Sequence, residues 1–214
     1  MHTQLRNIIQ RLSSRRVLWR GLPQGDNVFL TFDDGPHPTH TSLILDVLQE
    51  YNAKATFFVI GDCVRRSPEL VSEIAGRGHA LGLHNDSHVS FKGLSYMETM
   101  HQIEGCRTAV SNIVGVNPRI VRPPWGVVTV PLLLYALIKR YRLVLWSLDS
   151  GDHRADSVQT ISDQLTTPGV MRAGDVVLLH DDCRYTPQAL PEILAVLRER
   201  GLQAECLGCG VAPA

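Results

Sequence analysis

The sequence predicts a single α/β domain built around a parallel β-sheet. Seven short apolar segments alternate with helical segments, without a run of consecutive hairpins. The length of 214 residues suits one domain. The alternation fits a seven-fold barrel or an open doubly wound sheet, because the chain is short for an eight-fold barrel, for which about 250 residues are typical.

The elements follow from hydrophobic periodicity, taken in chain order. Short apolar runs predict strands at 28–32, 55–60, 79–83, 119–121, 143–147, 175–179 and 202–206. Apolar residues at helical spacing predict helices at 41–51, 67–76, 95–113, 131–140, 157–166 and 187–200. Ser67 with Pro68 marks a helix start, Ser95 with Glu98 forms a capping box, and Gly201 ends the last helix.

The composition excludes several classes of protein. The 21 basic and 21 acidic residues cancel, which argues against a nucleic-acid partner, since such a protein needs a net basic face. No apolar run approaches the roughly 18 residues of a membrane span. The five cysteines are odd in number and scattered, unlike a disulfide framework. Cys206 and Cys209 have CxxC spacing, which we interpret as incidental thiols, with redox or metal chemistry as the alternative.

The N-terminal residues predict a basic helical extension. Residues 1–20 contain five arginines and no acid, with apolar residues at helical spacing. The helix would either cover one end of the domain or lie on an anionic membrane surface. Because no uninterrupted apolar segment follows, we expect a cytoplasmic protein, with possible peripheral contact at the inner face of the membrane. The expected division is an extension at 1–25, a domain at 26–207 and a tail at 208–214.

Polar side chains follow five of the expected strands. They are Asp33 and Asp34, His84 and His88, Arg122, Asp149 and Asp152, and His180. In parallel α/β folds the carboxyl ends of the strands meet at one edge, where functional sites are assembled. The sequence therefore predicts a functional site at this edge.

Two of these groups suggest a metal site with an adjacent base. Two histidines four residues apart can converge on one ion, and a carboxylate would complete an open site. Asp33 and Asp34 point to opposite sides of an extended chain, so one could bind metal while the other acts as a base. Each motif alone is also compatible with a solvated loop.

The remaining groups suggest orientation and proton transfer. Arg122 could clamp a carboxylate, and an exposed Trp125 would suit stacking on a sugar. His180 could act as a general acid whose pKa is tuned by Asp152. Alone, each is also compatible with a structural role.

The ordered motifs TFDDGP, HxxxH, RPPWG, LDSGD and LLHD resemble the polysaccharide deacetylases with the NodB homology domain, carbohydrate esterase family 4. The resemblance covers residues 28–206. It implies a distorted seven-fold (β/α) barrel in a single domain. It also implies removal of an acyl group from an amino sugar with the help of one divalent metal ion, usually zinc and sometimes cobalt or another ion.

The resemblance also implies residue roles. Asp34, His84 and His88 match the metal ligands. Asp33 matches the catalytic base, Arg122 the residue that tethers it, His180 the catalytic acid and Asp152 its partner. Trp125 matches the oxyanion donor through its backbone N–H, and Leu178 the pocket wall for the acyl methyl group.

Two positions depart from the family pattern. Asn85 follows the first metal histidine, where serine or threonine is usual, and His153 stands where tryptophan usually walls the groove. The metal and acid–base positions are intact, so we expect activity to be kept, whereas the shape of the groove, and with it the substrate, is left open. The expected reaction is N-deacetylation of a GlcNAc-type sugar in an oligosaccharide or lipid-linked glycan. Deformylation or O-deacetylation of a glycolipid, and a catalytically silent sugar-binding module, are the alternatives.

Overall fold

A computed structural model describes residues 17–21 and 25–207. The strands are β1 (Val17–Leu18), β2 (Asn27–Asp33), β3 (Thr56–Val59), β4 (Ala80–Leu83), β5 (Ile120–Val121), β6 (Arg142–Val144), β7 (Leu148–Asp149), β8 (Val176–His180) and β9 (Gln203–Ala204). The helices are α2 (His40–Glu50), α3 (Gly61–Arg66), α4 (Pro68–Gly76), α5 (Tyr96–Val114), α6 (Val130–Lys139), α7 (Val158–Thr166) and α8 (Thr186–Glu199). Two short 3-10 turns are η1 (Pro124–Gly126) and η2 (Asp152–Arg154).

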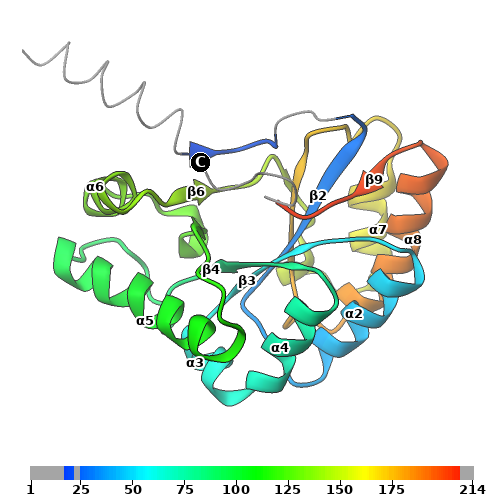
Figure 1. Cartoon of the computed structure of the whole chain (residues 1–214). Helices are drawn as coiled ribbons and strands as arrows, with labels where there is room; N and C mark the ends of the chain where they lie inside the picture. Colours follow the sequence, from blue (N-terminus) through cyan, green and yellow to red (C-terminus); the bar gives the residue numbers. More distant parts are fainter. Residues whose placement is uncertain (1–16, 22–24, 208–214) are drawn as a thin grey trace, which may run out of the picture.

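The strands form one curled parallel sheet in the order β1-β6-β5-β4-β3-β2-β8-β7, and β9 pairs with the start of β2. Helices cover its outer face, as Figure 1 shows. The segment 142–149 begins paired with β5 and ends paired with β8, so one stretch of chain reaches both sides of the curl. The expected α/β single domain with a distorted barrel is confirmed.

Side chains alternate between the two faces of the strands. In β8, Val177 and Leu179 join the large core between sheet and helices, whereas Val176 packs in a small cluster with Phe29 and Phe58. By this alternation Leu178 and His180 share the inner face with Val176. The inner face therefore leads from an apolar floor to polar groups at the carboxyl edge.

Most expected elements are present, and the differences have local reasons. Only the first two residues of the expected strand 143–147 lie in a strand, β6, and β7 begins just after it, at Leu148. The additional helix α3 ends at Ser67, whose N–H donates to the carbonyl of Cys63. Ser67 therefore closes α3 and does not cap α4 with its side chain, although Pro68 is in the first turn as expected. The capping box of Ser95 and Glu98 is present.

The N-terminal part of the described chain belongs to the sheet. Val17 and Leu18, which the sequence assigns to the extension, pair with Leu143 and Val144 of β6. Residues 1–16 and the tail 208–214 lie outside the described residues. In the described part of the chain, no helix has the length and apolar composition needed to cross a bilayer.

The cysteines differ in state. Cys63, Cys106 and Cys183 are free thiols, as expected. Cys206 is disulfide-bonded, so the interpretation of its CxxC segment as incidental thiols is wrong for this residue. Cys209 lies outside the described residues.

Candidate active site

The structure brings the polar groups of five strands to the carboxyl edge of the sheet. They come from the end of β2, the loop after β4, the loop after β5, η2 after β7 and the end of β8. Parallel pairing explains this convergence, because β2 lies directly between β3 and β8. The register places Asp33 opposite His180.

Asp34, His84 and His88 converge as a metal-ligand triad. The Oδ1 atom of Asp34 lies 3.2 Å from Nε2 of His84 and 3.1 Å from Nε2 of His88. This oxygen is buried and accepts no hydrogen bond within the described chain. Burial opposes ionisation of Asp34, but the two imidazoles outweigh it and hold the pKa of Asp34 well below its usual range. Three potential ligand atoms this close together, one of them a buried carboxylate oxygen, are suited to a cation.

The hydrogen bond of His84 fixes which nitrogen faces the triad. Its Nδ1 lies 2.8 Å from the carbonyl oxygen of Arg122. A carbonyl only accepts hydrogen bonds, so Nδ1 carries the proton and the lone pair of a neutral ring is on Nε2. This outer partner is of the kind that orients metal-bound histidines. Two imidazoles and one carboxylate fit a divalent ion with open positions, without distinguishing zinc from cobalt.

The backbone around the triad is strained at three residues. Asp34, Asn85 and His88 have φ values of 74°, 71° and 53°, in the left-handed region. The side chain of Asn85 accepts a hydrogen bond from the N–H of His88 at 2.6 Å and donates to the carbonyl of Val89 at 2.6 Å. Asparagine also tolerates positive φ better than most residues. Asn85 therefore closes the loop that carries both histidines.

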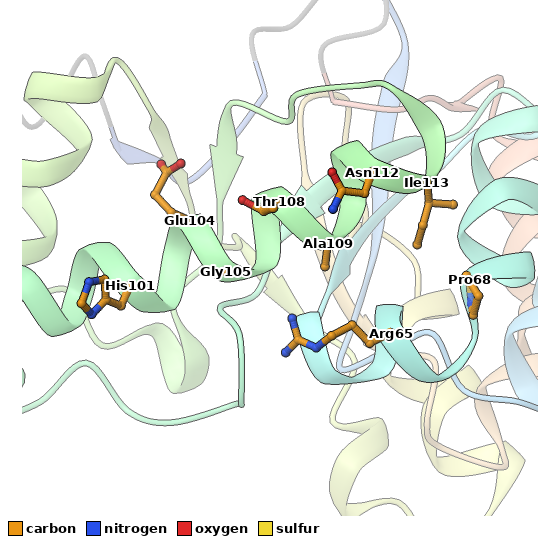
Figure 2. Close-up of a pocket in the computed structure, with 9 residues that line it drawn as sticks. All are labelled: Arg65, Pro68, His101, Glu104, Gly105, Thr108, Ala109, Asn112 and Ile113. Carbon is orange, nitrogen blue, oxygen red and sulfur yellow. The ribbon is translucent and has the colours of Figure 1, made fainter.

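Helices α3 and α5 support this loop from outside. Arg65 pairs with Asp86 at 2.9 Å, and Oε1 of Gln102 accepts hydrogen bonds from the N–H groups of Asp86 and Ser87. A Cβ at Gly105 would lie 2.7 Å from the carboxyl carbon of Asp86, so this close approach requires glycine. Arg65 of α3 and Gly105 of α5 are among the residues that line an outer pocket of about 700 Å³, and none of the triad residues lines it. Figure 2 shows the residues that line this pocket.

Arg122 holds Asp33 from inside the barrel. Its Nη1 donates to Oδ1 of Asp33 at 2.7 Å and to the hydroxyl of Thr31 at 2.6 Å. The other guanidinium nitrogens donate to the carbonyls of Val144 and Leu145. The side chain is fully buried and lies 4.2 Å from the ring centre of Phe58. One oxygen of Asp33 is therefore fixed, and Oδ2 is directed toward His84, 3.8 Å from its Nε2.

His180 and Asp152 form a second fixed pair. Nδ1 of His180 donates to Oδ1 of Asp152 at 2.7 Å. Oδ2 of Asp152 accepts from the N–H of His180 and from the hydroxyl of Thr186. Burial lowers the pKa of His180, but Asp152 and the nearby Asp33 and Asp34 raise it to about 9. His180 is thus charged at neutral pH, with Nε2–H left to donate.

Trp125 and Leu178 complete the predicted set. Trp125 lies in η1 with φ 54°, is 62% exposed, and its ring centre is 4.7 Å from that of His88. Its N–H makes no hydrogen bond within the described residues. Leu178 is buried on the inner face, two positions before His180.

A cavity of about 460 Å³ opens beside the pair formed by His180 and Asp152. Asp34, Asp152, His153 and His180 are among the residues that line it. Ligand atoms of Asp152, His153 and His180 lie within 4.8 Å of one another. However, the Asp152 carboxylate already accepts three hydrogen bonds, so we do not interpret this cluster as a second metal site.

Three supporting residues are missed by sequence reasoning. Thr31 shares a strand face with Asp33, and this two-residue spacing is a signal that could have found it. Asp181 is buried against Gly35, where a Cβ would lie 1.9 Å from its Oδ2, and burial raises the pKa of Asp181 to about 8. Thr186 is remote from Asp152 in sequence and gives no signal.

The fold is a parallel, curled α/β sheet, and an Asp-His-His triad lies at its carboxyl edge. A tethered carboxylate and a carboxylate-bound histidine flank this triad. Together these features are typical of a metal-dependent hydrolase. Residues 21–144 match the model of the family described as polysaccharide deacetylase. The chain belongs to the polysaccharide deacetylase family.

Similarity to known proteins supports this family assignment. The chain is 33% identical to a peptidoglycan-N-acetylglucosamine deacetylase of Bacillus cereus over 81% of its own length and 64% of that protein. It is 30% identical to a chitooligosaccharide deacetylase of Azorhizobium caulinodans, with 85% and 83% covered. A crystal structure of a peptidoglycan N-acetylglucosamine deacetylase superposes with a TM-score of 0.85 at 31% identity, covering 90% of this chain and 91% of the other. The chain thus spans less than two thirds of the first relative's length.

Proposed function

We propose that the protein is a metal-dependent hydrolase that removes the N-acetyl group from a GlcNAc-type amino sugar in a glycan. The observation that carries this proposal is the joint presence of the triad, the tethered Asp33 and the paired His180 around one edge. A site that only binds sugar does not require a fixed base or a charged imidazole. The named relatives act on peptidoglycan and chitooligosaccharide, which supports an acetylated amino-sugar substrate.

The proposed metal ligands are Asp34, His84 and His88. A divalent ion at this position would polarise the amide carbonyl and acidify water. Asp33 takes a proton from the attacking water at Oδ2, because Arg122 occupies Oδ1. Since Arg122 is itself held by the carbonyls of the barrel wall, Asp33 needs little reorganisation during proton transfer.

Other residues of the chain stabilise the oxyanion and protonate the leaving amine. The N–H of Trp125 donates to the oxyanion that develops on the carbonyl oxygen. His180 delivers its Nε2 proton to the departing amine nitrogen, and Asp152 holds the ring in the orientation that permits this. Leu178 contacts the acyl methyl group and limits the size of the group removed.

The finer substrate is also a proposal. We propose an oligosaccharide or a lipid-linked glycan, with a sugar ring of the substrate in the cavity that His153 lines. An imidazole there offers hydrogen bonds to sugar hydroxyls. The cytoplasmic location expected from the N-terminal residues stays a prediction, which cell fractionation would test.

The test combines metal analysis with product analysis. Purified protein is assayed for bound divalent metal and then incubated with N-acetylated chitooligosaccharides, peptidoglycan fragments, an N-formyl analogue and an O-acetyl sugar. Mass spectrometry is expected to show loss of acetyl from an N-acetyl substrate, and His88→Ala is expected to abolish both metal and turnover. Full metal occupancy without release from any N-acetyl sugar would contradict the proposal, and release from the formyl or O-acetyl compound alone would favour the corresponding alternative.

A further inference from the structure

Charge is segregated along this neutral chain. Residues 1–25 and 105–148 together contain 11 of the 21 basic residues and none of the 21 acidic residues. The rest of the chain therefore has an acidic excess of equal size. β1 and β6, which lie in these two stretches, are neighbouring strands at one end of the sheet. The two acid-free stretches thus meet on one side of the domain.

Helix α6, on this same side, has an apolar face in solvent. Val130, Leu134 and Ile138 are 69%, 48% and 62% exposed. Their spacing of four residues places them in one row, away from the buried Leu132 and Tyr135. Figure 1 shows α6 on the outside of the domain, next to the β6 end of the sheet. An exposed apolar row of this kind is typical of an interaction surface.

Cations gather where this row ends. Lys139, Arg140 and Arg142 are exposed, and so is Arg119, whose Nη1 donates to the carbonyl of Lys139 at 3.4 Å. None of the four forms a salt bridge with a carboxylate in the part of the chain that the structure describes. Their charge is therefore available to an anionic partner.

We propose that the outer row of α6 (Val130, Leu134 and Ile138) and its terminal cations dock on the surface of an anionic lipid bilayer. An apolar strip bordered by lysine and arginine is the pattern of interfacial helices, because the strip enters the acyl boundary while the cations meet lipid phosphates.

The sequence of residues 1–16 also supports an anionic bilayer as the partner. They contain Arg6, Arg11, Arg15 and Arg16, with Leu5, Ile8, Ile9 and Leu12 at helical spacing, and they lead into Val17 beside β6. The charge of this segment opposes its own packing against the cationic end of α6. An anionic surface would instead attract both segments at once.

Docking along α6 would also orient the candidate site. The helix begins at Val130, five residues after Trp125 at the carboxyl edge, and ends at the opposite edge of the sheet. A bilayer in contact with its whole length would lie beside the site rim. The proposal itself concerns binding and does not depend on deacetylase activity.

The test measures sedimentation with phosphatidylcholine vesicles that contain or lack phosphatidylglycerol. Wild type is expected to bind only the anionic vesicles. Leu134→Glu is expected to weaken binding at least about tenfold, because an apolar contact is replaced by a charge of the lipid's own sign. The matched control is Leu43→Glu on α2, where Leu43 is 49% exposed on another part of the surface, and it is expected to bind as wild type does. Lys139→Gln and Arg142→Gln are each expected to cost about fivefold.

Each other result overturns the proposal. These are absence of binding by wild type, equal binding to both vesicle types, full binding by Leu134→Glu, or equal loss in both glutamate variants. Thermal unfolding of the two variants shows whether they are folded. If light scattering shows a wild-type dimer that Leu134→Glu converts to a monomer without lipid, α6 is an interface between copies of the chain.

Discussion

Asp33 and Asp34 are adjacent in sequence and are held by different partners. Asp33 faces the guanidinium of Arg122, and Asp34 faces two imidazoles. We therefore predict that Asp33→Asn keeps the metal but lowers kcat by about 10²–10⁴-fold, the usual contribution of a general base. Asp34→Asn is expected to weaken metal binding itself, because a neutral amide replaces the charged ligand. Metal analysis and steady-state kinetics of both variants check this, and the reverse pattern would exchange the two roles.

His180 is expected to matter most when the leaving group is poor. An amine leaves an amide far less readily than an alkoxide leaves an ester, so protonation contributes more to the first reaction. His180→Ala should lower kcat for an N-acetyl sugar by at least about 100-fold and should affect an activated O-acetyl ester much less. The comparison uses both substrates with the same preparations. Equal losses on amide and ester would show that His180 is not the acid.

The charge of Asp152 sets the pH range in which His180 carries its proton. Asp152 opposes the effect of burial and contributes to the pKa of about 9 for His180. As pH rises past this value the acid form disappears, which gives the alkaline limb of the rate profile. Asp152→Asn removes the charge, so the limb should move to lower pH. A pH–rate profile with an unmoved alkaline limb would contradict this role.

At the residue scale the sequence predicts the charged groups better than their supports. Histidines and carboxylates at strand ends are conspicuous in the sequence. The predicted metal ligands and the predicted catalytic residues Asp33, Arg122, Asp152 and His180 all lie at one edge of the sheet. Thr186 is not conspicuous, because a threonine near a helix start is ordinarily explained by local structure. Its contact with Asp152 exists only because α8 begins beside η2.

At the element scale, His79 connects the starts of β3 and β4. Its Nδ1 accepts a hydrogen bond from the N–H of Ala55 at 3.2 Å, and burial together with Lys54 and Arg77 lowers the pKa of His79 to about 4. The unfolded chain protonates near 6.5, so the stabilisation is complete above pH 6.5 and is lost as pH falls toward 4. We expect a loss of up to about 3 kcal/mol across this window.

His79→Gln keeps an acceptor that does not titrate, so its stability should fall less between pH 7 and pH 4.5. Urea unfolding at the two pH values measures the difference, with His101→Gln on the exposed surface of α5 as the control. Parallel pH dependence of wild type and His79→Gln would show that this imidazole is not the titrating group.

The elements that sequence reasoning misses are defined by pairing. A single strand at 143–147 is the natural prediction for an apolar run, yet Leu145 donates to the carbonyl of Leu18 while Ser147 donates to that of Val176. The run therefore changes partners midway, which periodicity does not encode. β1 has two residues, too few to carry a pattern of its own.

At the scale of the whole molecule, the fold should not depend on the metal. The core between sheet and helices is apolar and continuous, and the triad lies at its margin. We expect the metal-free protein to keep its circular dichroism. Metal at about 100 times its Kd should add about 2.7 kcal/mol and raise Tm by roughly 5–10 °C. His84→Ala should lose this increment while staying folded.

The control for metal addition is magnesium, which binds oxygen ligands and should shift Tm little at a site with two imidazoles. An unfolded metal-free protein would contradict the expectation. The fold class itself is predictable from the alternation of elements, whereas the choice between barrel and open sheet is not. It depends on the partner change within 142–149, which links both sides of the curl.

Arg122 serves the barrel and the site with one side chain, and this has a consequence for how such proteins diverge. Replacing it would leave Asp33 buried without a counter-ion and would remove the donors to the carbonyls of Val144 and Leu145, a loss of the order of 3–5 kcal/mol. Replacing His88, which lies at the surface of the site, would cost the fold little. A lineage that abandons turnover should therefore shed a histidine long before the arginine. The presence of this arginine in a related protein therefore indicates that the related protein keeps the same fold, and it says little about whether that protein is still an enzyme.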